Sequence, residues 1–179
     1  MTTATGDFDL TIDELRVVAR FVAETAEAVL PVFEEAHPHD PRPRTALDAA
    51  WEFVNGARRS RLQRVTSMDA HRAAKVASTE SARLAAQAAG DAASAAYLHP
   101  IAKAHQVGHL LRAAANAARI AEIGAGGDPD AAEAVLVQAR ERATPVLIEV
   151  LSRYPAPPVG KSRTAQLMSA LDASLRSCR

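Results

Sequence analysis

The sequence has little of several things that common protein classes require. It has one cysteine, Cys178, so no internal disulfide can form, and this suits a reducing cytoplasm. Aromatic residues make up only 4% of the chain, which argues against a β-sandwich or barrel, because those folds depend on aromatic and β-branched side chains. No apolar run approaches the ~20 residues that span a bilayer, and the polar first ten residues lack the pattern of a signal peptide. We therefore expect a cytoplasmic protein without a membrane segment.

The chain also has no net charge. The 179 residues carry 21 basic and 21 acidic side chains, whereas a general nucleic-acid binder is basic overall, so no nucleic-acid partner is expected. The charges are unevenly placed: residues 1–40 hold nine acids and two bases, and residues 41–83 hold nine bases and four acids. Two interpretations remain open. The acidic first helix packs beside the basic segment and cancels it, or the basic segment presents a face to an acidic partner or ligand.

Alanine is what the chain has in excess. Hydrophobic residues make up 48% of the sequence, and 41 residues are alanine. Alanine is the strongest helix former and allows helices to approach closely, so the composition predicts an all-α fold, an antiparallel bundle of six to seven helices. We expect a single domain over residues 1–179, with a flexible N-terminus at 1–10 and a proline-rich linker at 154–161 before a C-terminal helix.

Periodicity and capping residues place the helices. Thr11 opens a T-x-x-E capping box before the first helix, and Pro31 predicts a kink or an early end of that helix. Gly56 suits the end of the second helix, Ser78 the start of the fourth, and Pro100 the first turn of the fifth. The expected helices cover about 12–33, 44–55, 58–77, 78–98, 100–124, 128–153 with a second kink at Pro145, and 162–175.

The most informative pattern is a polar stripe on each of the helices expected at 78–98 and 100–124. At 100° per residue, the stripes are formed by Glu80, Arg83, Gln87, Asp91 and Ser94 on the first, and by His105, His109, Arg112, Asn116 and Arg119 on the second. The short link predicts an antiparallel hairpin that turns near His99. That hairpin would pair Ser94 with His105, Asp91 with His109, Gln87 with Arg112, Arg83 with Asn116, and Glu80 with Arg119.

This ladder has two interpretations. Either both stripes face water, where such pairs contribute ~0–1 kcal/mol each, or they border a cleft in which an acid–histidine pair binds a ligand or transfers a proton. His105 and His109 are spaced as two metal ligands on a helix would be. However, Gln106 stands where a zincin has glutamate, and no spacing demands a third ligand. We expect a structural histidine pair, with no metal and no other cofactor.

Two further features lie in the second and third helices. Trp51 shares a helix face with Leu47 and Val54 and is expected to anchor the core. The arginine-rich run from Arg58 to Lys75 lacks the interleaved aromatic residues on which single-strand binders stack bases. This pattern favours a solvated or acid-paired helix face.

Three segments resemble bacterial proteins that are called putative immunity proteins. These are D-P-R-P-R-T-A-L-D-A-A-W-E-F-V-N-G at 40–56, A-H-R-A-A at 70–74, and A-H-Q-V-G-H at 104–109. The family consists of small all-helical chains associated with polymorphic toxin systems, and the resemblance covers about residues 38–122. The chain departs from the family pattern after Trp51, and its C-terminal third is unmatched. Actinobacterial relatives are sometimes labelled as an exonuclease subunit, which this sequence does not support, since it lacks a nucleotide-binding loop and a two-metal carboxylate cluster.

The resemblance implies a non-enzymatic helical protein that binds a protein partner such as a toxin. The partner surface could be the arginine-rich second and third helices. Homo-oligomerisation through alanine-rich faces is a further prediction.

The alternative is a small-molecule-binding protein or an enzyme of specialised metabolism, with its site between the fourth and fifth helices. A pocket over His105 and His109, lined by Trp51 or Tyr97, would favour this alternative, and a flat exposed seam would not. We assign no catalytic residue and no metal ligand. The candidate binding residues are Asp91, His99, His105, His109 and Arg112, joined by Asp40, Arg42, Arg44 and Trp51 if the fold brings them there.

Overall fold

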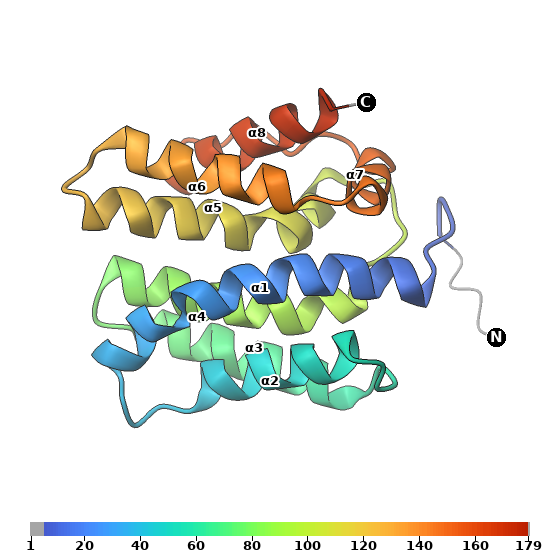
Figure 1. Ribbon diagram of the computed structural model, residues 1–179. Coiled ribbons are helices and arrows are strands. Elements are labelled where there is room, and N and C mark those ends of the chain that lie inside the picture. Colours follow the sequence, from blue (N-terminus) through green and yellow to red (C-terminus); the bar gives the residue numbers. More distant parts are fainter. Residues whose placement is uncertain (1–5, 179) are drawn as a thin grey trace.

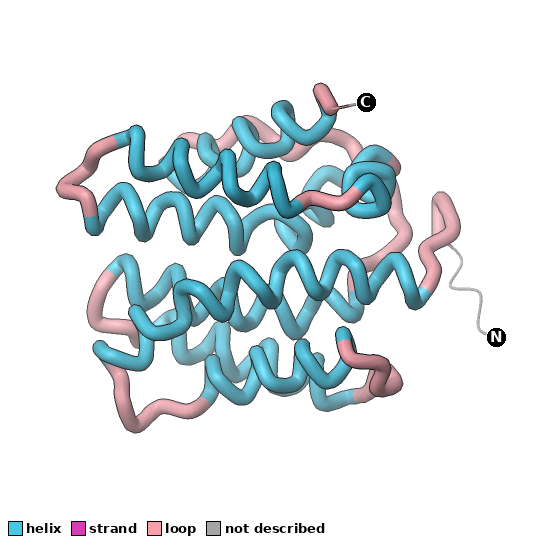
Figure 2. Tube along the Cα trace, in the orientation of Figure 1, coloured by secondary structure: helices cyan, strands magenta, loops and turns pink. Residues whose placement is uncertain are grey.

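The described part of the chain is helical, as its alanine content predicts. The computed structural model describes residues 6–178, and within that range it contains α-helices and short 3₁₀ helices but no strand (Figures 1 and 2). The all-α fold class is therefore confirmed. The α-helices are α1 (Ile12–Ala36), α2 (Arg42–Val54), α3 (Arg61–Lys75), α4 (Glu80–Ser94), α5 (Val107–Gly124), α6 (Pro129–Arg142), α7 (Pro145–Ser152) and α8 (Arg163–Arg176), with 3₁₀ helices η1 (Ala95–Tyr97) and η2 (Ala104–Gln106).

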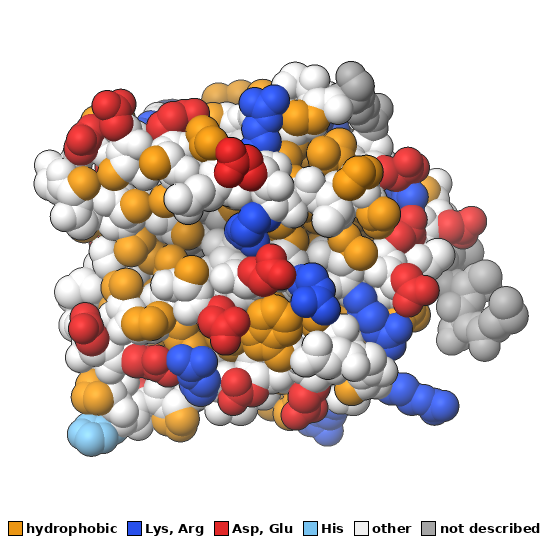
Figure 3. All heavy atoms as spheres, viewed as in Figure 1, with side chains coloured by type: hydrophobic (Ala, Val, Ile, Leu, Met, Phe, Trp, Pro, Cys, Tyr) orange, Lys and Arg blue, Asp and Glu red, His pale blue; other side chains and the backbone are white. Residues whose placement is uncertain are grey.

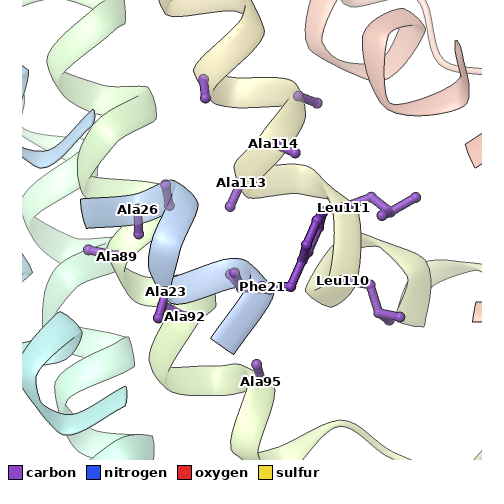
Figure 4. Close-up of a cluster of buried hydrophobic side chains, with 14 of the residues drawn as sticks. Phe21, Ala23, Ala26, Ala89, Ala92, Ala95, Leu110, Leu111, Ala113 and Ala114 are labelled. Atoms are coloured by element: carbon purple, nitrogen blue, oxygen red, sulfur yellow. The ribbon is translucent and has the colours of Figure 1, made fainter. Parts of the chain in front are cut away.

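Helix α4 lies at the centre of the bundle and packs against α1, α2, α3 and α5 (Figure 1). Its small side chains explain this position, because alanine allows several helices to approach one axis at once. Figure 4 shows Ala23 and Ala26 of α1 beside Ala92 and Ala89 of α4, while Phe21 reaches across to α5. The four alanines are fully buried, as expected for closely packed helices.

Capping residues set most of the helix ends. The capping box at Thr11 is present, with its Oγ1 accepting from the Glu14 amide, and α1 continues through Pro31 to Ala36, so the predicted early end is wrong. Gly56 follows α2 with a φ of 108°, a left-handed conformation that glycine adopts without strain. Thr79, rather than Ser78, caps α4.

The helix expected at 128–153 is two helices, so residues 6–178 contain one α-helix more than the predicted maximum of seven. Thr144 has an extended backbone with ψ of 158°, as the residue before a proline prefers, and its hydroxyl caps α7. Pro145 is therefore the first residue of a new helix and not a kink within a continuous one.

The fifth helix begins at Val107 and not at Pro100, so that prediction is wrong. Backbone groups near Pro100 are satisfied without a helix: the His99 amide donates to Gln106 Oε1 (3.1 Å), and the His99 carbonyl accepts from the Tyr154 hydroxyl (2.9 Å). Residues 98–103 consequently form an irregular link between η1 and η2.

Residues near both ends of the described range pack against the bundle. The expected flexible N-terminus lies partly outside the described residues, but the Phe8 ring packs edge-on against Tyr154, with centroids 5.0 Å apart. The segment between α7 and α8 contains no helix, and α8 packs on α5. Among residues 6–178, no helix is both long enough and apolar enough to cross a membrane.

Candidate functional site

The polar ladder between α4 and α5 is present, but three of its pairs are displaced by one helical turn from those predicted. The Glu80–Arg119 pair is confirmed, with Arg119 Nε 3.1 Å from Glu80 Oε1. The predicted pairs Ser94–His105, Asp91–His109, Gln87–Arg112 and Arg83–Asn116 are wrong. The observed pairs are Ser94 with His109 (3.2 Å), Asp91 with Arg112 (2.8 and 2.5 Å) and Gln87 with Asn116 (2.9 Å).

The length of the connection causes this displacement. A turn near His99 requires two helices joined by a very short link, whereas the chain inserts η1, the irregular residues 98–103 and η2. Ser94, Asp91 and Gln87 of α4 therefore each pair with a residue one turn further along α5, whereas Glu80 keeps its predicted partner. The exchange places an arginine, and not a histidine, opposite Asp91.

Asp91 is the centre of this cluster and is completely buried. The Arg112 guanidinium donates to both of its carboxylate oxygens, through Nε (2.8 Å) and Nη2 (2.5 Å). Such a bidentate pair fixes the plane of the arginine as well as its charge. His71 Nε2 of α3 lies 3.5 Å from Asp91 Oδ1, so three helices converge on one carboxylate.

The histidine reaches Asp91 because α3 and α4 approach closely at Gly90. A Cβ atom at that position would lie 2.8 Å from His71 Nε2, closer than real Cβ contacts. The Ser67 hydroxyl donates to the Gly90 carbonyl at 2.8 Å and closes the same contact. Burial lowers the pKa of His71, although the Asp91 charge partly offsets the effect. The neutral imidazole is therefore favoured beside this pair.

Asn116 extends the cluster along α5 and is also completely buried. Its Nδ2 donates to the Leu84 carbonyl (3.1 Å) and to Gln87 Oε1 (2.9 Å). The second bond fixes the orientation of the Gln87 amide, since the oxygen faces Asn116. The interpretation that both stripes face water is therefore wrong for Asp91 and Asn116.

Two cavities flank the outer edge of this cluster, and both are lined by Arg83, Gln87 and Arg112. The first, which we name the α3–α5 cavity, has a volume of about 330 Å³ and is also lined by His71, Ala74 and Lys75. The second, of about 310 Å³, lies between α4 and the start of α8 and is also lined by Glu80, Leu84, Ser162, Arg163, Thr164, Ala165 and Met168. Neither has His105, His109, Trp51 or Tyr97 in its wall, so neither is the pocket over the two histidines that would favour the small-molecule alternative.

The structure brings together only some of the predicted binding residues. Asp91 and Arg112 are in contact, and His109 lies beside them through Ser94. Burial lowers the pKa of His109, which favours its neutral form as well. His99 and His105 are exposed and do not join the hydrogen bonds of Asp91 in the described part of the chain.

The second group of predicted residues lies around the start of α2 and along it, in separate pairs. Asp40 accepts from Arg42 (2.9 and 2.6 Å), and Arg44 donates to both oxygens of Glu34 on α1 (2.8 and 2.9 Å). Trp51 is half-buried against the core. None of the hydrogen bonds and ion pairs that these four residues form within residues 6–178 involves Asp91.

Sequence reasoning missed the contribution of α3. His71 and Gly90 were not among the candidate binding residues, and neither were Lys75 and Arg83, which line the α3–α5 cavity. One signal was available, because His71 lies in the A-H-R-A-A segment that carries part of the family resemblance.

The acids of α1 pair with arginines of other segments, but within residues 6–178 with none of α3. Examples are the pairs Arg44–Glu34, Arg142–Glu24 and Arg153–Glu14. Figure 3 shows acidic and basic side chains interspersed on the face where α1 lies. No ion pair joins α1 to α3 among the described residues, whereas Glu34 of α1 pairs with Arg44 of α2, so the interpretation that the acidic first helix cancels the basic segment holds for Arg44 and not for the arginines of α3.

The outer face of α3 therefore keeps its own charges and also exposes apolar side chains. We define this face by Arg61, Leu62, Arg64, Val65, Met68 and Arg72, all of which are exposed. Met68 retains half of its accessible surface. Half of the large hydrophobic residues that are exposed in residues 6–178 lie on α3 or directly after it: Leu62, Val65, Met68 and Val76. This clustering makes the outer face of α3 a candidate contact surface.

The described residues contain no group of three or more histidine, cysteine or acidic side chains that could hold a metal ion.

A comparison with protein-family models matches residues 10–145 to the family described as Imm-5 like putative immunity protein. The matched range contains α1 to α6, and so it includes the Asp91 cluster and the outer face of α3 but not α8. Comparisons with characterised proteins and with solved structures gave no match.

Proposed function

Because the chain belongs to this family of Imm-5 like immunity proteins, we propose that it acts in the cytoplasm by binding and inhibiting a toxin protein, without catalysis of its own. Family membership supports an immunity role. The finer statement, that binding occurs through the outer face of α3, rests on one structural observation. That face combines exposed apolar side chains with arginines that α1 does not neutralise.

The composition of the face indicates the chemistry of the partner. Arg61 and Arg64 form no ion pair with a described residue, and Arg72 pairs only with the neighbouring Asp69 (2.8 Å). Opposite charges speed association and exclude wrong partners, while buried apolar side chains supply most of the affinity. The partner is therefore expected to present an acidic rim around an apolar centre, with Met68 as the residue that it covers.

Co-expression with candidate toxin proteins tests the proposal. We expect growth rescue and a stable complex on size-exclusion chromatography. The Met68→Asp and Arg61→Glu substitutions should each abolish rescue while leaving the helical circular dichroism unchanged. Val137→Asp and Arg140→Glu provide matched controls, because both residues are exposed on α6, away from α3. Equal loss of rescue in both pairs of variants, or in neither, would contradict a role for this face.

A second copy of the chain is the other protein that could cover this face. Sedimentation of the free protein distinguishes the two cases. A monomer that becomes a heterodimer with toxin supports the proposal. A dimer that Met68→Asp dissociates would assign the face to self-association instead.

The alternative function, binding of a small molecule between α4 and α5, is favoured by a separate observation. The two cavities beside Arg112 lie along the predicted seam, although not over its histidines.

A further inference from the structure

We propose that the α3–α5 cavity binds a doubly charged oxyanion, the phosphate group of a small phosphate monoester. Its lining side chains include Lys75, Arg83, Gln87 and Arg112. This inference does not depend on toxin binding, because the outer face of α3 was defined without any of these residues.

Arg112 provides a donor that is already held in place. Its Nε and Nη2 atoms are bound to Asp91, whereas Nη1 forms no hydrogen bond with a described residue. The buried carboxylate therefore holds the guanidinium as a rigid group at the edge of the cavity. A donor that is fixed before binding loses little conformational freedom when an oxyanion arrives.

Gln87 provides a second donor of fixed orientation. Its Oε1 accepts the hydrogen bond from Asn116, so the Nε2 group is the part of the amide that remains to donate. Since Gln87 lines the cavity as Arg112 does, a neutral donor and a charged donor meet there.

The charge balance selects a dianion. No carboxylate lines this cavity, and Lys75 and Arg83 form no ion pair within residues 6–178, whereas Arg112 is neutralised by Asp91. Two positive charges therefore remain uncompensated beside the cavity. A phosphate monoester carries about −1.5 to −2 charges at neutral pH, while a single carboxylate carries only one.

The volume of about 330 Å³ lies at the small end of the range for ligand sites, which favours a small ester over a large cofactor.

His71 adds a group whose protonation responds to the ligand. Its charge state depends on Asp91 of α4, Arg112 of α5 and Lys75 of α3, and burial lowers its pKa. A bound dianion opposes that shift, so ligand binding and protonation of His71 should strengthen each other.

Calorimetric titration with inorganic phosphate tests the site, at constant ionic strength and with acetate and chloride as comparison anions. We expect phosphate to bind more tightly than either. Arg83→Gln and Lys75→Gln should each weaken it about tenfold, as expected for loss of a charged hydrogen-bond donor. Arg58→Gln is the matched control, since Arg58 is exposed outside the cavity and should leave phosphate binding unchanged. Phosphate that binds no more tightly than chloride, or equal binding by all three variants, would overturn the proposal.

Sulfate provides the pH test, because it remains a dianion across the range in which phosphate itself titrates. Sulfate affinity should rise as the pH falls from 8 to 5.5 in the unchanged protein, and this rise should be smaller in His71→Asn. Equal pH dependence in the two proteins would exclude His71 from the site.

The source of the phosphate group is tested separately. Glycerol 2-phosphate should bind at least as tightly as a phosphoserine-containing peptide. Tighter binding of the peptide would show that the ligand is a phosphorylated segment of a partner protein, and it would overturn the small-molecule assignment. Arg61→Glu, on the outer face of α3, should not change phosphate binding, so failure of this proposal and failure of the toxin proposal are distinguishable.

Discussion

The contact between His71 and Gly90 predicts that one substitution reverses its effect when a second residue is changed. In most helix interiors, glycine to alanine stabilises the fold by ~1 kcal/mol, because glycine loses more backbone freedom on folding. Gly90 lies inside α4 without a positive φ, so its backbone would accept alanine. The obstacle is the His71 ring, which lies 2.8–3.0 Å from the position of the new Cβ atom.

The magnitude follows from these two opposing effects. Overpacking of a filled contact costs ~1–3 kcal/mol, against the ~1 kcal/mol gained from the helix backbone. Gly90→Ala should therefore lower the free energy of unfolding by about 1 kcal/mol. In a His71→Ala background the ring is gone, and the same change should raise the free energy of unfolding by ~0.5–1 kcal/mol. The resulting coupling energy is ~2 kcal/mol, within the range found for residues in contact.

Urea unfolding of the four proteins in this cycle, followed by circular dichroism, measures the coupling. Gly108→Ala on α5 is the control, because a Cβ atom there meets no heavy atom within 4 Å. Its effect should be independent of His71. A Gly90→Ala effect that has the same sign and size in both backgrounds would show that α3 does not press on α4 at this position and that His71 is not held beside Asp91 by this contact.

Three further predictions concern the charged groups. Asp91→Ala removes the carboxylate from its partly exposed arginine partner and should cost ~3 kcal/mol in chemical denaturation, whereas Asp69→Ala, in an exposed pair, should cost less than ~1 kcal/mol. Burial lowers the pKa of His71, so just below pH 6.5 the unfolded chain binds more protons at His71 than the folded protein does. The free energy of unfolding should therefore fall as the pH drops below 6.5, and it should fall less steeply in His71→Asn. Hydrogen bonds from Arg163 and Arg119 lower the pKa of Glu122 to about 2. The stabilising contribution of Glu122 is therefore present above pH 4.5 and is lost as the pH falls towards 2. Glu122→Gln should be less stable than the unchanged protein at pH 7 and should lose less stability across that acid range, as thermal melts would show.

Local features of the chain were predictable because they depend on neighbours in sequence. The Thr11 capping box and the members of both polar stripes follow from spacings of three and four residues. The start of α5 was not predictable in the same way, because the Tyr154 hydroxyl binds the His99 carbonyl from a distant segment. Capping of a separate α7 by Thr144 was the missed alternative to a kink at Pro145.

The register between α4 and α5 shows why pattern analysis reached the right stripe and the wrong partners. Alanine surfaces are nearly uniform, so a shift of one helical turn buries a similar apolar area and keeps polar groups opposite one another. The predicted Asp91–His109 pair and the observed Asp91–Arg112 pair are both chemically reasonable, and only the length of the link separates them.

The burial of the polar stripe depends on a third helix, α3, which a comparison of the α4 and α5 sequences alone does not include. Asp91 is buried because α3 crosses α4 at Gly90 and places His71 over the carboxylate. In a uniform alanine core, the paired polar groups Asp91–Arg112 and Gln87–Asn116 are the contacts that a one-turn slip would break. A slip would place His109 opposite the buried Asp91 carboxylate and would remove its two hydrogen bonds from Arg112, and loss of the charged partner of a buried carboxylate is strongly destabilising. The same pairs hold Arg112 and Gln87 beside the α3–α5 cavity, so the contacts that define the register also orient its hydrogen-bond donors.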